Sequence, residues 1–167
     1  VAKRSRTYVA KVLSGISGEY YKNYNVNKLI RRSNGIDLYY GDKSEFFSYD
    51  KVVLASHADQ ALSIIDEPTK EEQEILSTFK YRENIAVIHT DESIMPKNKD
   101  IWSSWNSSVD KDNVENNSIT YWLNLLQNLD FNKNIFLTLN PNFKINEDNI
   151  LKKVNFTHPY FDLSALD

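Results

Sequence analysis

The sequence predicts a mixed α+β fold, and three features of its 167 residues indicate this class. Apolar residues recur at helical spacing between residues 8 and 16, which is typical of an amphipathic helix. A stretch rich in β-branched and aromatic residues, 20–49, contains two turn signals and predicts an antiparallel meander of three strands. The run 50–56 is apolar without alternation, as in a strand of a parallel sheet that is covered on both faces.

Local signals define the elements of the first half. The N-terminal helix is expected to end near Gly18, and the meander is expected to turn at Asn34-Gly35 and again at Gly41-Asp42. The expected strands of the meander are 20–32, 36–40 and 45–49. After the apolar run, a short helix is expected at 58–65. Another helix is expected after Thr69, whose hydroxyl can cap it while Glu72 completes a capping box.

The second half is richer in strands. The best candidates are 84–89, 118–123 and 134–139. Between the first two lies a long polar stretch, 97–117, which contains Trp102 and Trp105 and is expected to be a packed loop.

Composition excludes several classes of protein. A net charge of −3 argues against a general nucleic-acid binder, and the basic residues near the start are expected on the solvated face of the first helix. The absence of cysteine excludes disulfides, zinc–thiolate sites, iron–sulfur clusters and cysteine nucleophiles. Because no apolar run approaches the length of a membrane helix and no signal-peptide core precedes the first helix, we expect a soluble, cytoplasmic protein. The chain begins at Val1 rather than Met, which favours a segment of a longer protein.

Common catalytic motifs are missing from the sequence. No Gly-x-Ser-x-Gly is present, and the four glycines are placed so that neither a Gly-x-Gly-x-x-Gly nor a Walker loop can form. The pair His89 and Asp91 brings two potential metal ligands together, but one pair does not make a metal site, and no metal is expected. His89 is therefore expected to be structural or to face a substrate.

A cluster of aromatic and carboxamide residues is the strongest candidate for a binding site. Large aromatic side chains beside carboxamides form an apolar pocket with a few orienting hydrogen-bonding groups. The alternative is a core with polar edges, since buried tryptophan is common and its N–H requires a partner. The cluster comprises Trp102, Trp105, Asn106, Tyr121, Trp122, Asn124 and Gln127.

Several strings of the sequence resemble one enzyme family. Asn25-Val26-Asn27-Lys28-Leu29, the hairpin at Asn34-Gly35 and the run Tyr49-Asp50-Lys51-Val52-Val53-Leu54-Ala55-Ser56-His57 are similar to the middle portion of flavin-containing amine oxidases and phytoene-desaturase-like enzymes. Further strings resemble NAD/FAD-binding, amine-oxidase-like bacterial oxidoreductases. These are Asp66-Glu-Pro-Thr, Tyr81-Arg-Glu-Asn84, His89-Thr-Asp91, Met95-Pro96, Trp102-x-x-Trp105-Asn106, Tyr121-Trp122-x-Asn124 and Thr138-Leu-Asn140-Pro141.

The resemblance implies that the chain is the central part of an FAD-dependent oxidoreductase, in which hydride passes from the substrate to the flavin. Residues 1–60 would belong to the FAD-binding domain and residues 61–167 to a substrate-domain-like region. Val26 would offer backbone hydrogen bonds near the adenine of FAD, and Ala55, Ser56 and His57 would border the cofactor cleft. Because the glycine-rich loop of the family is absent, this chain alone is expected neither to bind FAD tightly nor to be active.

The resemblance also implies a substrate pocket, although it names no catalytic base. The pocket candidates are His89, Trp105, Asn106, Tyr121 and Asn124. Family members are often encoded beside cyclopropane-fatty-acid-synthase-like methyltransferases, which favours a lipid acyl chain over a small amine as the substrate.

Two alternatives remain open at this point. The chain could be a small non-enzymatic binding module that uses the tryptophan–asparagine cluster for a partner or a lipid. The parent enzyme could instead be a polyene- or carotenoid-type desaturase or isomerase. If the chain is a fragment, its truncated sheet exposes unpaired strand edges, which favour self-association of the chain.

Overall fold

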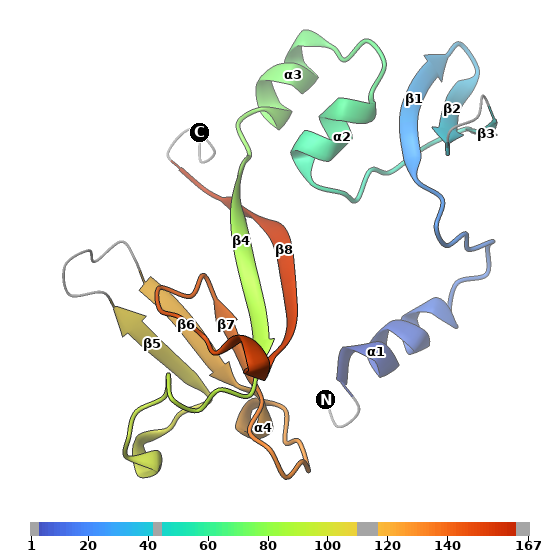
Figure 1. Ribbon diagram of the computed structural model, residues 1–167. Helices are drawn as coiled ribbons and strands as arrows, with labels where there is room; N and C mark the ends of the chain where they lie inside the picture. The colour runs from blue at the N-terminus through green and yellow to red at the C-terminus, as the bar shows by residue number, and fades with distance from the viewer. Residues whose placement is uncertain (1–3, 42–44, 110–116, 163–167) are drawn as a thin grey trace. The chain divides into compact units, whose positions relative to one another are not determined.

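The computed structural model describes residues 4–41, 45–109 and 117–162 (Figure 1). The described residues of Val1–Tyr81 and Pro159–Asp167 form one compact unit, and those of Arg82–His158 form the other. Each unit contains an antiparallel sheet, and helices accompany the sheets, so the predicted α+β class is confirmed. The domain boundary expected near residue 60 falls inside the first unit, within helix α2 (Ala58–Ile64). The compact units do not test the division into cofactor and substrate regions.

The first unit contains three helices and a three-stranded sheet of order β1-β2-β3. Its elements are α1 (Arg4–Leu13), β1 (Val26–Arg32), β2 (Gly35–Tyr40), β3 (Phe46–Tyr49), α2 (Ala58–Ile64) and α3 (Lys70–Leu76). The three strands of the predicted meander are confirmed, and Asp42 of the expected second turn lies outside the described residues. Strand β1 begins only at Val26, and α1 ends at Leu13, before the glycines. Gly35 is required at the first turn because it has φ +152° and a Cβ there would lie 2.6 Å from the Tyr49 carbonyl oxygen.

One buried carboxylate connects all three strands of the meander. Asp37 of β2 accepts hydrogen bonds from Arg32 Nε of β1 at 2.8 Å and from Ser48 Oγ of β3 at 2.6 Å. The hydrogen bond from Ser48 and then that from Arg32 hold the pKa of Asp37 below its usual range. The carboxylate is therefore charged and fully paired inside the meander.

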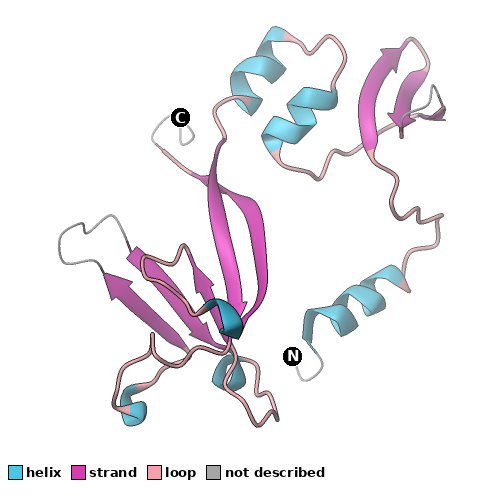
Figure 2. Ribbon diagram, in the orientation of Figure 1, coloured by secondary structure: helices cyan, strands magenta, loops and turns pink. Residues whose placement is uncertain are grey.

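The prediction of a buried strand at 50–56 is wrong. Figure 2 draws the connection between β3 and α2 as a loop, and no strand is assigned there. Val53 is 90% exposed, whereas Val52 and Leu54 are half-buried. A run of apolar residues becomes a buried strand only when neighbouring strands and layers cover both of its faces. Within the described residues the segment is covered on one face.

The two helices after this segment agree with the sequence. Helix α2 is joined to β1 because Leu29 forms a parallel bridge with Ile65 and accepts a hydrogen bond from the N–H of Asp66 at 2.8 Å. The capping box at the start of α3 is confirmed. The Glu72 N–H donates to Thr69 Oγ1 at 3.1 Å, and the Thr69 N–H donates to Glu72 Oε2 at 2.9 Å.

The second unit is built on a five-stranded sheet of order β5-β6-β7-β4-β8. Its elements are β4 (Lys80–His89), η1 (Lys99–Ile101), β5 (Trp105–Val109), β6 (Asn117–Trp122), α4 (Leu123–Leu126), β7 (Phe136–Leu139), η2 (Glu147–Asn149) and β8 (Ile150–Tyr160). Strand β4 begins in the first unit, and strand β8 ends in it. The predicted strands at 84–89, 118–123 and 134–139 correspond to β4, β6 and β7.

Two strands of this sheet differ from the sequence-based expectation. Part of the expected loop at 97–117 is strand β5, which pairs antiparallel with β6 in the register Trp105↔Tyr121. Strand β8 has no counterpart in the prediction, because nearly all its residues are exposed and its apolar residues do not alternate. In both cases pairing with a distant strand, rather than local pattern, makes the segment a strand. No helix in the described part of the chain is long and apolar enough to cross a membrane.

The capping box provides a test of the first unit. We expect Thr69→Ala to lower the free energy of unfolding by about 1 kcal/mol, because the mutant loses the hydroxyl that accepts the Glu72 N–H. Thr69→Ser retains that hydroxyl and is the matched control. Urea denaturation followed by circular dichroism measures the difference, and equal stability of the two variants would contradict the capping role.

Candidate functional site

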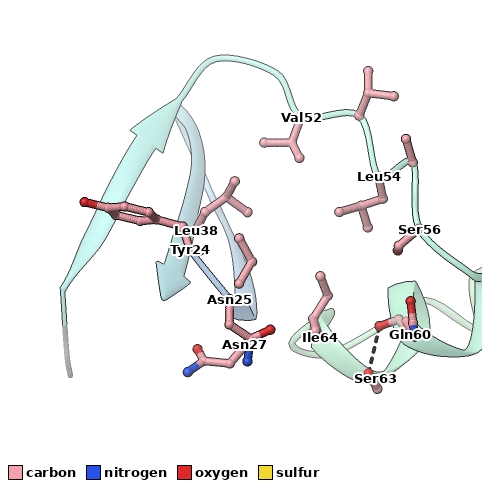
Figure 3. Close-up of a pocket in the computed structure, with 13 residues that line it drawn as sticks. Tyr24, Asn25, Asn27, Leu38, Val52, Leu54, Ser56, Gln60, Ser63 and Ile64 are labelled. Atoms are coloured by element: carbon pink, nitrogen blue, oxygen red, sulfur yellow. Dashed lines mark hydrogen bonds between the residues drawn. The ribbon is translucent and has the colours of Figure 1, made fainter. Parts of the chain in front are cut away.

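A cavity of about 700 Å³ lies in the first unit between the start of β1, Leu38 of β2, the extended segment 52–56 and helix α2 (Figure 3). Three of the four residues expected to contact a cofactor, Val26, Ala55 and Ser56, line it. The chain therefore brings two distant segments of the sequence to one place. The full lining is Tyr24, Asn25, Val26, Asn27, Leu38, Val52, Val53, Leu54, Ala55, Ser56, Gln60, Ser63 and Ile64.

The lining of this cavity is neutral. Its polar side chains are carboxamides and hydroxyls, with the phenol of Tyr24, and no Asp, Glu, Lys or Arg is among them. Ser63 Oγ donates to the carbonyl oxygen of Gln60 at 2.7 Å, and Asn27 Nδ2 donates to the carbonyl oxygen of Gly41 (Figure 3 shows the first of these). Such a lining suits a planar, uncharged group with hydrogen-bonding edges. It does not suit a pyrophosphate, which requires cations or a glycine-rich loop.

His57, the fourth expected cofactor residue, lies next to this cavity in sequence but is not part of its lining. It occupies the N-cap position of α2, and its ring stacks on Tyr81 with centroids 4.5 Å apart. The Tyr81 hydroxyl accepts the Ala58 N–H at 2.7 Å. The Nδ1 atom of His57 is buried without a hydrogen-bond partner in the described chain, and the nearest carboxylate oxygen of Asp59 is 4.0 Å away. This nitrogen can therefore accept or donate one further hydrogen bond.

A second cavity, of about 750 Å³, shares Val52 and Leu54 with the first. It is bounded by β1, β2 and helices α2 and α3, and its polar groups include the ion pair of Arg31 with Glu72. Sequence reasoning missed this cavity because an unbroken apolar run does not reveal which of its residues will be covered. The remaining lining is Leu29, Ile36, Ala61, Ile65, Thr69, Glu71, Ile75 and Leu76.

His89 is fully buried in the second unit, and both of its ring nitrogens are used. Nδ1 accepts the N–H of Asp91 at 3.2 Å, so the proton of the neutral ring is on Nε2, which lies 2.8 Å from Thr138 Oγ1. Thr138 Oγ1 lies 2.9 Å from Thr120 Oγ1, so the series of hydrogen bonds extends to strand β6. Burial lowers the pKa of His89, against a smaller opposing effect of Asp91. The geometry is that of a structural histidine.

Trp105 and Tyr121 form a cross-strand aromatic pair on the second unit. Their ring centroids are 5.4 Å apart in an edge-to-face arrangement, and Trp105 is 63% exposed. Trp102 instead packs edge-to-face against Trp122 and Phe136, so the cluster expected from the sequence divides into an exposed and a packed part. The exposed pair presents an aromatic surface that a ligand can contact.

The two carboxamides of the expected substrate pocket bind backbone. Asn106 Oδ1 accepts the Ser103 N–H at 3.1 Å, and its Nδ2 donates to the Ser103 carbonyl oxygen at 2.7 Å. Asn124 Oδ1 accepts the Ile135 N–H at 2.7 Å, and its Nδ2 donates to the Lys133 carbonyl oxygen at 2.9 Å. These contacts fix the segments before β5 and β7. Neither cavity described above contains any of the five expected pocket residues.

Comparisons with known proteins find a likeness in structure only. No family model matches the sequence, and no curated protein matches it. The fold is similar to the crystal structure of a CLA-producing fatty acid isomerase from P. acnes, with a TM-score of 0.55 and 12% sequence identity. The match covers 93% of this chain and 39% of the isomerase chain, so this chain spans about two fifths of that protein's length. At this identity the likeness establishes the fold.

No group of three potential metal-ligating side chains is found among the described residues.

The buried histidine gives a prediction about pH. Because the pKa of His89 in the folded chain is below the ordinary value of about 6.5, the unfolded chain takes up this proton first as the pH falls. The contribution of His89 to stability is thus complete above about pH 6.5 and decreases below it. We expect urea midpoints to fall between pH 7 and pH 5, and less so in His89→Gln. Nitrogen-detected NMR that shows a proton on Nδ1, or titration above 6.5, would contradict this assignment.

Proposed function

We propose that this chain is part of an FAD-dependent oxidoreductase of the amine-oxidase superfamily whose substrate is a lipid acyl chain. The observation that carries the proposal is the convergence of Val26, Ala55 and Ser56 on one neutral cavity. The sequence resemblance implies a cofactor contact for each of these three residues. Their meeting in a single site is the expected result if the resemblance reflects a shared cofactor site.

The chemistry of the cavity supports a position for the nucleoside end of the cofactor. An adenine is planar and uncharged, and its edges require amide and hydroxyl partners of the kind that Asn25, Asn27 and Gln60 offer. When bound, the flavin supplies the two-electron chemistry by accepting hydride from the substrate. The residues of this chain bind and orient the nucleoside end and exclude water from the apolar wall of Val52 and Leu54.

The structural likeness to a fatty acid isomerase supports a lipid acyl chain rather than a small amine. The same likeness favours a second candidate function, in which the enzyme moves a double bond along an acyl chain without net oxidation. In both cases the exposed Trp105–Tyr121 pair contacts the substrate, while Asn106 and Asn124 hold the segments on which the pair is mounted.

The first test of the proposal is the visible absorption spectrum of purified protein from the complete reading frame, beside that of this 167-residue chain. We expect flavin bands in the longer protein and none in the chain alone, because the neutral cavity provides no site for the pyrophosphate. Flavin in neither protein would refute the assignment and favour a non-enzymatic binding module.

A cavity-filling variant connects the spectrum to the proposed site. Ala55 is exposed at the wall of the cavity, so Ala55→Trp should fill the space without disrupting the packed core. We expect this variant of the longer protein to lose most of its flavin. Ala10→Trp on the exposed face of α1 is the matched control and should keep its flavin. Equal flavin content in the two variants would show that this cavity is not part of the cofactor site.

The aromatic pair gives an independent prediction for the longer protein. We expect Trp105→Ala to raise KM for the acyl substrate at least about fivefold, since truncation of an aromatic anchor in a binding site typically costs more than 1 kcal/mol. Ile101→Ala is the control, because Ile101 is also 63% exposed but lies in η1, outside the pair. Unchanged turnover and affinity in Trp105→Ala would exclude Trp105 from the substrate site.

A further inference from the structure

The first 24 residues differ in charge from the rest of the chain. They contain one acidic residue, Glu19, and five basic residues, so their net charge is +4, whereas that of the whole chain is −3. A charge asymmetry of this kind indicates an anionic partner for the basic segment. The five basic residues are Lys3, Arg4, Arg6, Lys11 and Lys22.

Helix α1 presents an apolar face to solvent. Tyr8, Val9 and Val12 share one side of the helix and are 64%, 49% and 49% exposed. At 3.6 residues per turn, Lys11 borders this side on one edge and Arg6 borders it on the other. An apolar stripe between basic edges is typical of helices that lie in the plane of a membrane surface.

Three exposed tyrosines follow the helix in the sequence. Tyr20, Tyr21 and Tyr24 are 56%, 42% and 46% exposed, and the rings of Tyr21 and Tyr24 lie with centroids 5.0 Å apart. The Tyr21 hydroxyl donates to Glu19, and this hydrogen bond raises the pKa of Tyr21 to about 12. Tyrosine is enriched where membrane meets water, because its ring is apolar and its hydroxyl remains hydrated.

We propose that residues 4–24 form a docking surface for an anionic lipid bilayer. Helix α1 lies along the surface, with Tyr8, Val9 and Val12 among the lipid headgroups and with Arg6 and Lys11 beside lipid phosphates. The surface does not depend on the flavin proposal, because the basic and apolar side chains of α1 are sufficient to form it.

Other kinds of partner would use less of this surface. A nucleic acid would engage the cations and leave the apolar stripe in water. A neutral bilayer would accept the stripe and leave the cations without partners. An anionic bilayer uses both features of the segment.

The test is co-sedimentation of the 167-residue chain with vesicles of phosphatidylcholine, with or without 30% phosphatidylglycerol. We expect binding to the anionic vesicles that is lost at 0.5 M salt. Since each cation near an anionic surface contributes about fivefold to binding, Arg6→Glu with Lys11→Glu should lower the partition coefficient at least about 20-fold. Val9→Ser with Val12→Ser should lower it as well. Hydrogen exchange should show protection at residues 4–24 when vesicles are added.

The control is Lys97→Glu with Lys152→Glu, which changes the net charge by the same amount at exposed positions of the second unit. This variant should bind vesicles like the parent chain. The proposal is overturned if the control loses as much binding as the variant of Arg6 and Lys11, or if neutral and anionic vesicles bind equally. It is also overturned if protection appears elsewhere in the chain. Tighter binding to a DNA duplex than to the vesicles would assign the segment to a nucleic acid instead.

Discussion

The first unit depends on the pairing of one buried carboxylate. Asp37 accepts from Arg32 and Ser48 and so ties the second strand of the meander to both neighbours. A buried carboxylate without these partners would destabilise the fold, so its charge requires the three strands to keep their register. That register sets the position of Leu38 and of the start of β1, which form one wall of the neutral cavity. The backbone pairing of Leu29 with Ile65 then brings helix α2 to the opposite wall.

A series of hydrogen-bonded, buried polar side chains has a comparable role in the second unit. His89, Thr138 and Thr120 come from three adjacent strands, and each side chain provides a hydrogen-bond partner for the next. A register shift by one residue would leave these groups unpaired inside the sheet, which is costly. The histidine singled out by the sequence thus belongs to the framework of this unit. Among the residues expected at the substrate site, Trp105 is exposed and lies against Tyr121, so a ligand can contact this pair.

The proposed function rests on the sequence resemblance, and the structural comparison shows the fold. The sequence strings resemble flavin-containing amine-oxidase-like enzymes, and the fold is similar to part of a fatty acid isomerase. The residues that the resemblance assigns to the cofactor lie in the first unit, and those that it assigns to the substrate lie in the second. The docking surface at residues 4–24 is a separate proposal, which rests on the charge of this segment and the exposure of α1.

The sequence by itself determined the elements whose signals are local. The turn at Gly35, the capping box of Thr69 and Glu72, and the α+β class each follow from residues close together in the chain. Tertiary structure decided the rest. The run 50–56 has the composition of a buried strand but is covered on one face, while β5 and β8 are strands because distant partners pair with them. Burial and strand pairing are properties of the neighbours of a segment, and these neighbours are brought together only by the folded chain.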